Sequence, residues 1–415
     1  MSQIDNIMDI KLIEEINKAE LEIQDDFKRL DQIAFENQYK VLKAMQNEYL
    51  GSSDFMWTTG YGYGDIGRDK VEQIYKNIFH TEDALVRPSI ASGTHAIYLS
   101  LKSILNSGDG LLFASDLPYD TMQKAIGLTD DERGTLKDKG IDIDFADLEN
   151  NKMSIENISK KIKDNTKVIA IQRSTGYSLR SAFSIDEIGD IIKKIKTINK
   201  DLIVFVDNCY GEFTNTLEPS DVGADLVAGS LIKNPGGGVA LSGGYIVGRS
   251  DLVELCSNEL TAPGIGKEVG LSFGTTRQTL QGLFLAPHIT KQAMKGAYLM
   301  QRVFYNRGYD IIPKIGEERS DIVQCIIFND PDKLKTFAIS IQKAGAVDAH
   351  AIPTAWDMPG YEDQVIMASP SFIDGSSIEL SADAPMREPF AAYYQGGLTY
   401  EHCKIGLLSA LKNLD

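Results

Sequence analysis

Apolar residues recur at helical spacing from residue 9 to residue 48. Ile23, Phe27, Leu30 and Ala34 lie three or four residues apart, and mostly polar or charged residues stand between them. Gly and Ser residues at 51–53 then end the pattern. We expect an N-terminal helical arm that packs on the body of the protein or on a partner subunit.

Beyond residue 68, short apolar runs alternate with helical patterns such as that at 184–198. This alternation is typical of an α/β fold, in which a mostly parallel sheet carries helices on both faces. The apolar runs lie at 84–87, 110–114, 167–172, 202–206 and 244–247.

The last third of the chain follows another pattern, with a long helix expected at 281–307 and strands at 323–328 and 378–381. A length of 415 residues corresponds to two or three domains. We expect a helical arm at 1–55, a large α/β domain at 56–285 and a smaller C-terminal α+β domain at 286–415.

The charge balance changes which partners are expected. Lys and Arg number 42 and Asp and Glu 59, so the formal net charge is −17. Nucleic acids and anionic membranes need a basic face, so neither is an expected partner. No apolar run approaches the roughly 18 residues of a membrane-spanning helix.

The cysteines indicate a compartment. The four cysteines are scattered and form no C-x-x-C pair, which is typical of buried thiols in a reducing environment. The N-terminal segment has no apolar stretch like that of a secretory signal. We therefore expect a cytoplasmic protein.

Three motifs could suggest other chemistry. Residues 62–67 fit G-x-G-x-x-G, but the segment before them is a poor strand, which argues against a dinucleotide site. Residues 230–233 fit S-x-x-K, but the S-D-N and K-T-G motifs that accompany it in penicillin-recognising enzymes do not occur. The five histidines are dispersed, so no metal site is expected.

Four features in order form the candidate site. Ser92, Gly93 and Thr94 precede a helical pattern, and Tyr119 follows 26 residues after Gly93. Asp207 ends the apolar run at 202–206, and Lys233 follows 26 residues later, before a Gly-rich loop. The carboxyl ends of parallel strands are where α/β folds place ligands.

Pyridoxal 5′-phosphate (PLP) chemistry requires these four groups. A lysine amine forms a Schiff base with the cofactor aldehyde, and a carboxylate pairs with the ring nitrogen. A helix N-terminus binds the phosphate, and an aromatic ring stacks on the pyridine. Each feature alone has an ordinary structural explanation, such as a helix cap at Ser92. Their order and spacing together favour PLP.

The sequence resembles the fold-type I PLP enzymes, and within them the cystathionine and methionine lyase superfamily. It is most similar to the branch known as aluminium-resistance or cystathionine β-lyase-like proteins, over about residues 9–415. The segments that carry this resemblance are 60–68, 91–96, 172–174, 206–213, 229–238, 281–284, 385–389 and 395–398.

The resemblance implies roles for the cofactor site. Lys233 would hold PLP and then act as general base, and Asp207 would pair with the ring nitrogen. Tyr119 would stack on the ring and could shuttle protons. The phosphate would be bound at the helix start 92–94 and by Ser230.

The resemblance also implies contacts to substrate and to a second subunit. Arg387 would bind the substrate carboxylate, because a guanidinium fits a carboxylate bidentately. In the lyases a Tyr-x-Arg reaches the neighbouring subunit's phosphate site. Here Tyr61, Tyr63 and Arg68 stand in that stretch without that spacing, and which of them acts there stays open. Tyr210 has the spacing of an aminotransferase tyrosine that bonds the cofactor hydroxyl.

These implications lead to one expected activity. The chain would be a PLP-dependent carbon–sulfur lyase acting on a sulfur-containing amino acid, in a homodimer or homotetramer with shared active sites. An aminotransferase, an aldolase or a non-catalytic PLP-binding protein of the stress response are the alternatives.

Overall fold

A seven-stranded sheet forms the larger part of the computed structural model, which describes residues 9–129 and 132–414. Its strands are β1 (Asp83–Arg87), β2 (Gly110–Phe113), β3 (Asp142–Phe145), β4 (Thr166–Gln172), β5 (Ile203–Asp207), β6 (Leu226–Ser230) and β7 (Gly244–Gly248). Their order is β1-β7-β6-β5-β4-β2-β3. In this sheet β7 runs opposite to the other six strands, so the predicted mostly parallel sheet is confirmed.

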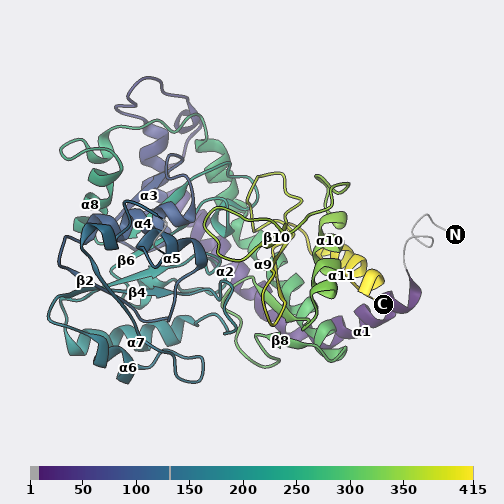
Figure 1. Cartoon of the computed structure of the whole chain (residues 1–415). Helices are drawn as coiled ribbons and strands as arrows, with labels where there is room; N and C mark the ends of the chain where they lie inside the picture. Colours follow the sequence, from purple (N-terminus) through teal and green to yellow (C-terminus); the bar gives the residue numbers. More distant parts are fainter. Residues whose placement is uncertain (1–8, 130–131, 415) are drawn as a thin grey trace.

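Helices cover both faces of this sheet (Figure 1). They are α3 (Ile66–Ile78), α4 (Gly93–Ile104), α5 (Asp120–Ile126), α6 (Ile155–Lys161), α7 (Ile185–Ile198) and α8 (Ser250–Leu260). Side chains alternate between the two faces of a strand. In β5 the side chains on both faces are buried, because helices cover both faces of the sheet. Ile203 and Phe205 share a core with α4, whereas Val204 and Val206 share one with α7.

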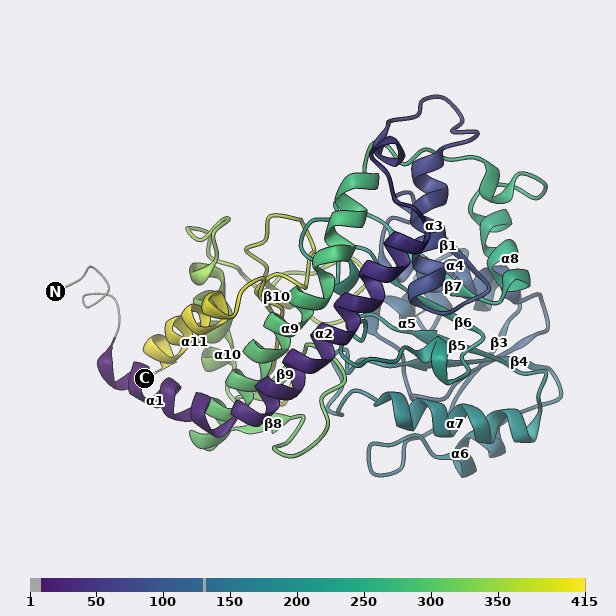
Figure 2. The same ribbon diagram turned by 180° about the vertical axis from the view of Figure 1, so that it is seen from behind.

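The N-terminal arm is two helices, α1 (Ile10–Glu22) and α2 (Gln24–Asn47). The expected helix over 9–48 is therefore broken once, at Ile23, where φ is −116° and ψ is 16°. The α2 helix runs beside α9 (Thr276–Asn306), as Figure 2 shows. The first eight residues of the predicted arm lie outside the described part of the chain.

A smaller sheet is wholly antiparallel and has the order β10-β11-β12-β9-β8. Its strands and the helices packed with it are β8 (Asp310–Ile312), β9 (Gln324–Ile327), β10 (Val365–Ala368), β11 (Ser381–Pro385), β12 (Ala391–Gln395), α10 (Pro331–Ala344) and α11 (Tyr400–Leu414). Short 3-10 helices are η2 (Ser52–Phe55), η3 (Lys137–Lys139), η4 (Pro219–Val222), η5 (Asn234–Gly236) and η6 (Gly266–Glu268). In the ranges described above, no helix is long and apolar enough to cross a membrane.

One predicted strand is wrong in position. The apolar residues Ile378 and Leu380 suggest a strand at 378–381, but only Ser381 belongs to β11. Both apolar side chains are buried from an irregular segment, so their burial does not reflect strand pairing. The α9 helix runs through residue 285, and the predicted domain boundary there stays a prediction.

Candidate active site

Two strand ends place polar groups beneath the start of α4. Asp207 is the last residue of β5 and lies on the same face as Phe205, because strand side chains alternate. Ser230 ends β6 on the face that Leu226 and Ala228 share with α4. The two side chains therefore come together on the α4 side of the sheet.

The start of α4 approaches these strand ends closely. The Ser92 hydroxyl accepts a hydrogen bond of 3.0 Å from the His95 N–H and caps the helix. A Cβ added to Gly93 would lie 3.1 Å from Cys209 Sγ and 3.4 Å from Ser230 Cβ. The absence of a side chain at Gly93 favours this close approach, which brings the N–H groups of the helix start to the site. Such a helix start is suited to an anion.

Lys233 is held in the loop after β6. Its neighbour Asn234 donates hydrogen bonds to the carbonyls of Tyr210, at 3.0 Å, and Glu212, at 2.9 Å. The Lys233 Nζ lies 4.1 Å from the centroid of the Tyr210 ring. Tyr210 has a φ of 71°, a left-handed conformation that is uncommon for a residue with a side chain. The fixed loop therefore sets the position of the amine.

Asp207 and Lys233 influence each other's charge. Burial raises the pKa of Asp207, and the Lys233 ammonium acts in the opposite direction. Burial lowers the pKa of Lys233, but Cys209, Tyr210 and Asp207 outweigh it, and the pKa is raised overall. One Asp207 oxygen accepts a hydrogen bond of 3.0 Å from the Cys209 N–H. The Asp207 carboxyl group also lines the cavity described below.

Tyr119 stands in a cluster of tyrosines. Its backbone N–H donates to Gln172 Oε1 at 2.6 Å, and its hydroxyl lies 2.7 Å from the Tyr361 hydroxyl. The ring meets that of Tyr177 edge-on, with centroids 5.0 Å apart. Burial raises the pKa of Tyr119 well above its ordinary value, and that of Tyr361 to about 12. Both phenols are therefore neutral at physiological pH.

The side chains described above line a cavity of about 520 Å³ between the large sheet and the small sheet. Its wall on the small-sheet side includes Ser381, Asp383 and Gln395. The predicted site residues that line it are Ser92, Gly93, Thr94, Tyr119, Asp207, Tyr210, Ser230 and Lys233.

Comparison with known proteins identifies the family. The family model for methionine gamma-lyase matches residues 12–415, almost the whole chain. The chain belongs to the methionine gamma-lyase family. An uncharacterized Bacillus subtilis protein, YnbB, is 46% identical over 405 residues, which are 96% of each chain. L-methionine gamma-lyase of Treponema denticola is 26% identical over 196 residues, covering 47% of this chain and 45% of that enzyme.

Solved structures agree with membership of the methionine gamma-lyase family. A carbon-sulfur lyase involved in aluminum resistance from Clostridium novyi is 47% identical, with a TM-score of 0.95, and 99% of this chain and 98% of that chain are covered. The pyridoxal-5′-phosphate dependent protein YhfS of Escherichia coli has a TM-score of 0.62 at 16% identity, covering 92% and 95%. The latter likeness shows the fold alone. The predicted family and fold-type I architecture are thus confirmed.

Four predicted site residues of this methionine gamma-lyase family member do not line the cavity. Tyr61 and Tyr63 are 77% and 66% exposed on the loop before α3. Arg68 is buried and donates to the carbonyls of Gly62 and Gly270. Arg387 Nη1 lies 3.2 Å from Asp120 and 3.0 Å from Asp363. Their roles in a partner's site or toward a substrate carboxylate stay predictions.

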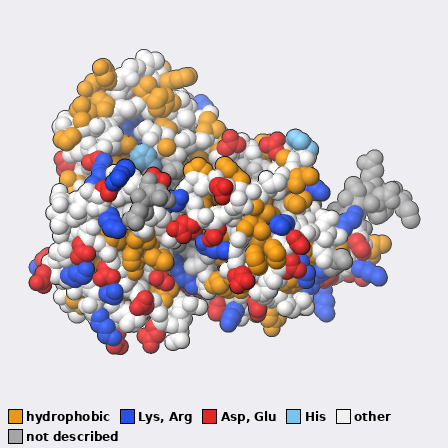
Figure 3. Space-filling view, in the orientation of Figure 1, with side chains coloured by type: hydrophobic (Ala, Val, Ile, Leu, Met, Phe, Trp, Pro, Cys, Tyr) orange, Lys and Arg blue, Asp and Glu red, His pale blue; other side chains and the backbone are white. Residues whose placement is uncertain are grey.

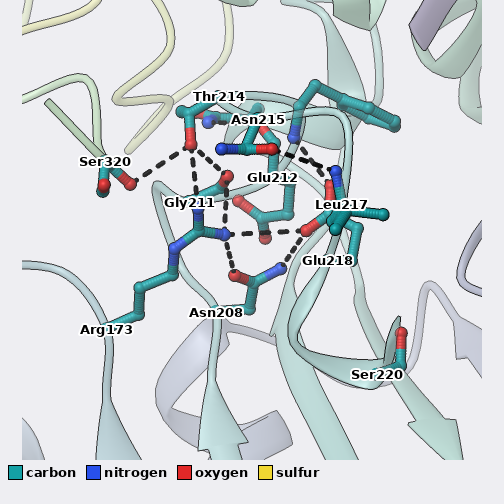
Figure 4. A network of polar contacts seen from close by, with 12 residues as sticks. Arg173, Asn208, Gly211, Glu212, Thr214, Asn215, Leu217, Glu218, Ser220 and Ser320 are labelled. Carbon is teal, nitrogen blue, oxygen red and sulfur yellow. Dashed lines mark hydrogen bonds and ion pairs between the residues drawn. The ribbon is translucent and has the colours of Figure 1, made fainter. Parts of the chain in front are cut away.

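A buried network holds the loop that follows Asp207 (Figure 4). Arg173 Nη1 donates to Asn208 Oδ1 at 2.8 Å and to the Gly211 carbonyl at 2.9 Å. Glu218 accepts from Asn208 at 2.9 Å and lies 3.7 Å from Arg173. Because all these groups are buried, their mutual bonds replace those to water and fix the loop.

Glu212 projects into the same buried region. Its Oε1 accepts a hydrogen bond of 2.7 Å from the Tyr245 hydroxyl, whereas Oε2 has no partner among the described residues. Burial raises the pKa of Glu212 to about 8, and the Tyr245 hydrogen bond opposes this. Glu212 is therefore mostly protonated at neutral pH.

Sequence reasoning missed the small-sheet wall and Gln172. Ser381 and Asp383 lie in β11 and Gln395 in β12, and nothing in their spacing relates them to Lys233. Gln172 ends β4, so its place at a strand end was a usable signal. Across 9–129 and 132–414, no group of three His, Cys, Asp or Glu could hold a metal ion.

Proposed function

We propose that this family member is a PLP-dependent carbon–sulfur lyase acting on a sulfur-containing amino acid. The observation that carries the proposal is the convergence of Lys233, Asp207 and the start of α4 on one cavity. The reaction would be β- or γ-elimination. The carbon–sulfur bond breaks, sulfur leaves with the bonding electrons and takes a proton, and water releases ammonia and a 2-oxo acid.

The residues present fit the cofactor. The close approach at Gly93 and the N–H groups of α4 suit a phosphate, with Thr94 and Ser230 beside it. The Asp207 carboxylate would suit the ring nitrogen, and the Tyr119 ring would suit one face of the pyridine. The Tyr210 hydroxyl would suit the hydroxyl of the cofactor ring. PLP, when bound, supplies an electron sink for a carbanion at the substrate Cα.

The chain's own groups would handle protons. Lys233 Nζ would hold the cofactor and, as a free amine, would act as the base for the substrate Cα proton. The Tyr119 hydroxyl is neutral and bonded to Tyr361, so it can donate a proton to the departing sulfur. The enclosing tyrosines limit the access of water.

The test is a visible absorption spectrum of the purified protein supplied with PLP. We expect a Schiff-base band that shifts on addition of L-cystathionine, L-cysteine or L-methionine, together with release of a 2-oxo acid. The Lys233→Ala variant should lose the band and the activity, because no other amine replaces Nζ. A variant that retains turnover, or a wild-type protein without the band, would contradict the proposal.

Aminotransferase activity is the second candidate, and Tyr210 favours it. This tyrosine follows Asp207 by three residues and lines the cavity, as its aminotransferase-like spacing predicts. Transfer of the amino group from a substrate to a 2-oxo acid, without thiol release, would select this alternative. Carbon–carbon cleavage would indicate an aldolase, and a band that no amino acid shifts would indicate a non-catalytic binding protein.

The proposal includes an assembly and a location. Hydrophobic side chains gather on the loop before α3, where Met56, Trp57, Tyr61 and Tyr63 are exposed (Figure 3). We propose that a second copy covers this loop in a homodimer or homotetramer, with Arg68 close to the shared site. The four buried, unpaired cysteines support a reducing compartment, the cytoplasm.

A further inference from the structure

One face of the small sheet turns polar side chains toward the cavity. Ser381 and Asp383 are two residues apart on β11 and therefore share a face. Gln395 stands opposite Ser381 on β12. All three line the cavity and are buried, and Asp383 is only 7% exposed.

This wall holds polar atoms that the chain leaves unpaired. The hydroxyls of Ser377 and Ser381 are buried and have no hydrogen-bond partner among the described residues. Gln395 Nε2 donates to Asp383 Oδ2 at 3.1 Å. Buried polar groups without partners are destabilising unless a ligand or water supplies them.

The cavity holds more acidic than basic side chains. Among the described residues, Lys233 is the one cationic side chain that lines the cavity, together with Asp207, Asp374 and Asp383. Arg387 is held by Asp120 and Asp363 instead. Burial raises the pKa of Asp383 to about 6, and Tyr177, Gln395 and the charge of Lys233 act in the opposite direction. The small-sheet wall therefore carries an acidic group and, in the described part of the chain, no cationic side chain of its own.

We infer that Asp383, with the hydroxyls of Ser377 and Ser381, binds a primary ammonium group on the sulfur substituent of the substrate. The inference rests on the proposed function and names its substrate class: an amino acid whose sulfur carries an aminoalkyl arm. An ammonium has three donors, which match a carboxylate and two hydroxyls. Met358, Met367 and Tyr361 line the same cavity and suit the methylene groups of that arm. The wall has no cation for a carboxylate on the arm.

The experiment compares two nearly isosteric probes. S-(2-aminoethyl)-L-cysteine ends its arm in an ammonium, and S-propyl-L-cysteine ends it in a methyl group. We expect the PLP-loaded protein to show a kcat/KM, measured by thiol release, about tenfold or more higher for the aminoethyl compound. The Asp383→Asn variant should lose that preference, because its kcat/KM should fall far more for the aminoethyl compound than for the propyl compound.

Binding without turnover provides an independent readout. Dissociation constants from calorimetry in the Lys233→Ala background should show the same preference, and adding Asp383→Asn should remove it. Asp383→Glu keeps the charge and should retain part of the preference. Ser381→Ala is the second variant if Asp383→Asn does not fold. It removes one hydrogen-bond acceptor and should reduce the preference for the aminoethyl compound by about threefold to tenfold.

The outcomes separate the two proposals. Equal loss on both probes, or an unchanged preference in Asp383→Asn, would overturn the ammonium subsite. Ammonium-selective binding without thiol release from either probe would leave the subsite standing and contradict the lyase. Thiol release from both probes without any preference would support the lyase and overturn the ammonium subsite.

Discussion

At the scale of single residues, two buried carboxyl groups near Lys233 differ in whether they line the cavity. Asp383 lines it, whereas Glu212 lies away from it and bonds Tyr245. The protonation of Glu212 should contribute to the pH dependence of folding, because its pKa of about 8 is well above the ordinary value of 4.5.

Glu212→Gln should make stability less dependent on pH. A carboxyl whose pKa is raised on folding binds more protons in the native state, so stability falls as pH rises from about 4.5 to about 8. Gln keeps an oxygen for Tyr245 and removes the buried charge. We expect the wild type to lose a few kcal/mol more than the variant between pH 5 and pH 9, as measured by urea unfolding. Parallel pH profiles would contradict the assignment.

At the scale of elements, the site depends on how closely α4 meets the ends of β5 and β6. Gly93→Ala places a methyl group 3.1 Å from Cys209 Sγ and 3.4 Å from Ser230 Cβ, so these side chains or the start of α4 must shift by a few tenths of an ångström. We expect the affinity for PLP, measured by absorbance titration, to fall about tenfold or more.

Gly189→Ala is the matched control. Gly189 lies in α7, a helix that contributes no side chain to the cavity. A Cβ added there would lie 3.1 Å from Val222 Cβ, so the crowding is similar to that at Gly93. The substitution should lower thermal stability without changing the PLP affinity. An equal loss of affinity in both variants would mean that general loosening, not the α4 approach, is responsible.

The large-sheet half of the site was predictable at this scale, and the small-sheet half was not. Asp207 follows the apolar run at 202–206, and such a run defines a strand end directly. Lys233 could be recognised from its spacing to Asp207 and from the Gly-rich loop after it. Ser381 belongs to β11, whose start the pattern at 378–381 misplaced, because burial of Ile378 resembles strand alternation. Arg387 could be recognised from a motif, but its pairing with Asp120 depends on tertiary contacts that no local pattern encodes.

At the scale of the whole molecule, the exposed aromatic loop before α3 predicts an assembly. Tyr63→Asp should weaken it, because a charge replaces an aromatic ring in an apolar contact. We expect light scattering to show a lower molar mass than for the wild type. The affinity for PLP should fall in parallel.

Tyr49→Asp provides the control for that substitution. Tyr49 is 89% exposed after α2 and lies outside the loop. It should leave both the molar mass and the PLP affinity unchanged. A Tyr63→Asp protein with the wild-type mass would show that the loop is not the contact.

The two ends of the described chain meet, and this affects synthesis. Leu12, Ile16 and Ala19 of α1 share a core with residues of α9 and α11, and Lys404 lies 2.8 Å from Glu20. A ribosome therefore releases the apolar face of α1 well before α9 and α11, the helices that share its core. During most of translation this face is open to chaperones. Protease sensitivity of α1 in ribosome-stalled chains should persist until residues 400–414 have left the exit tunnel.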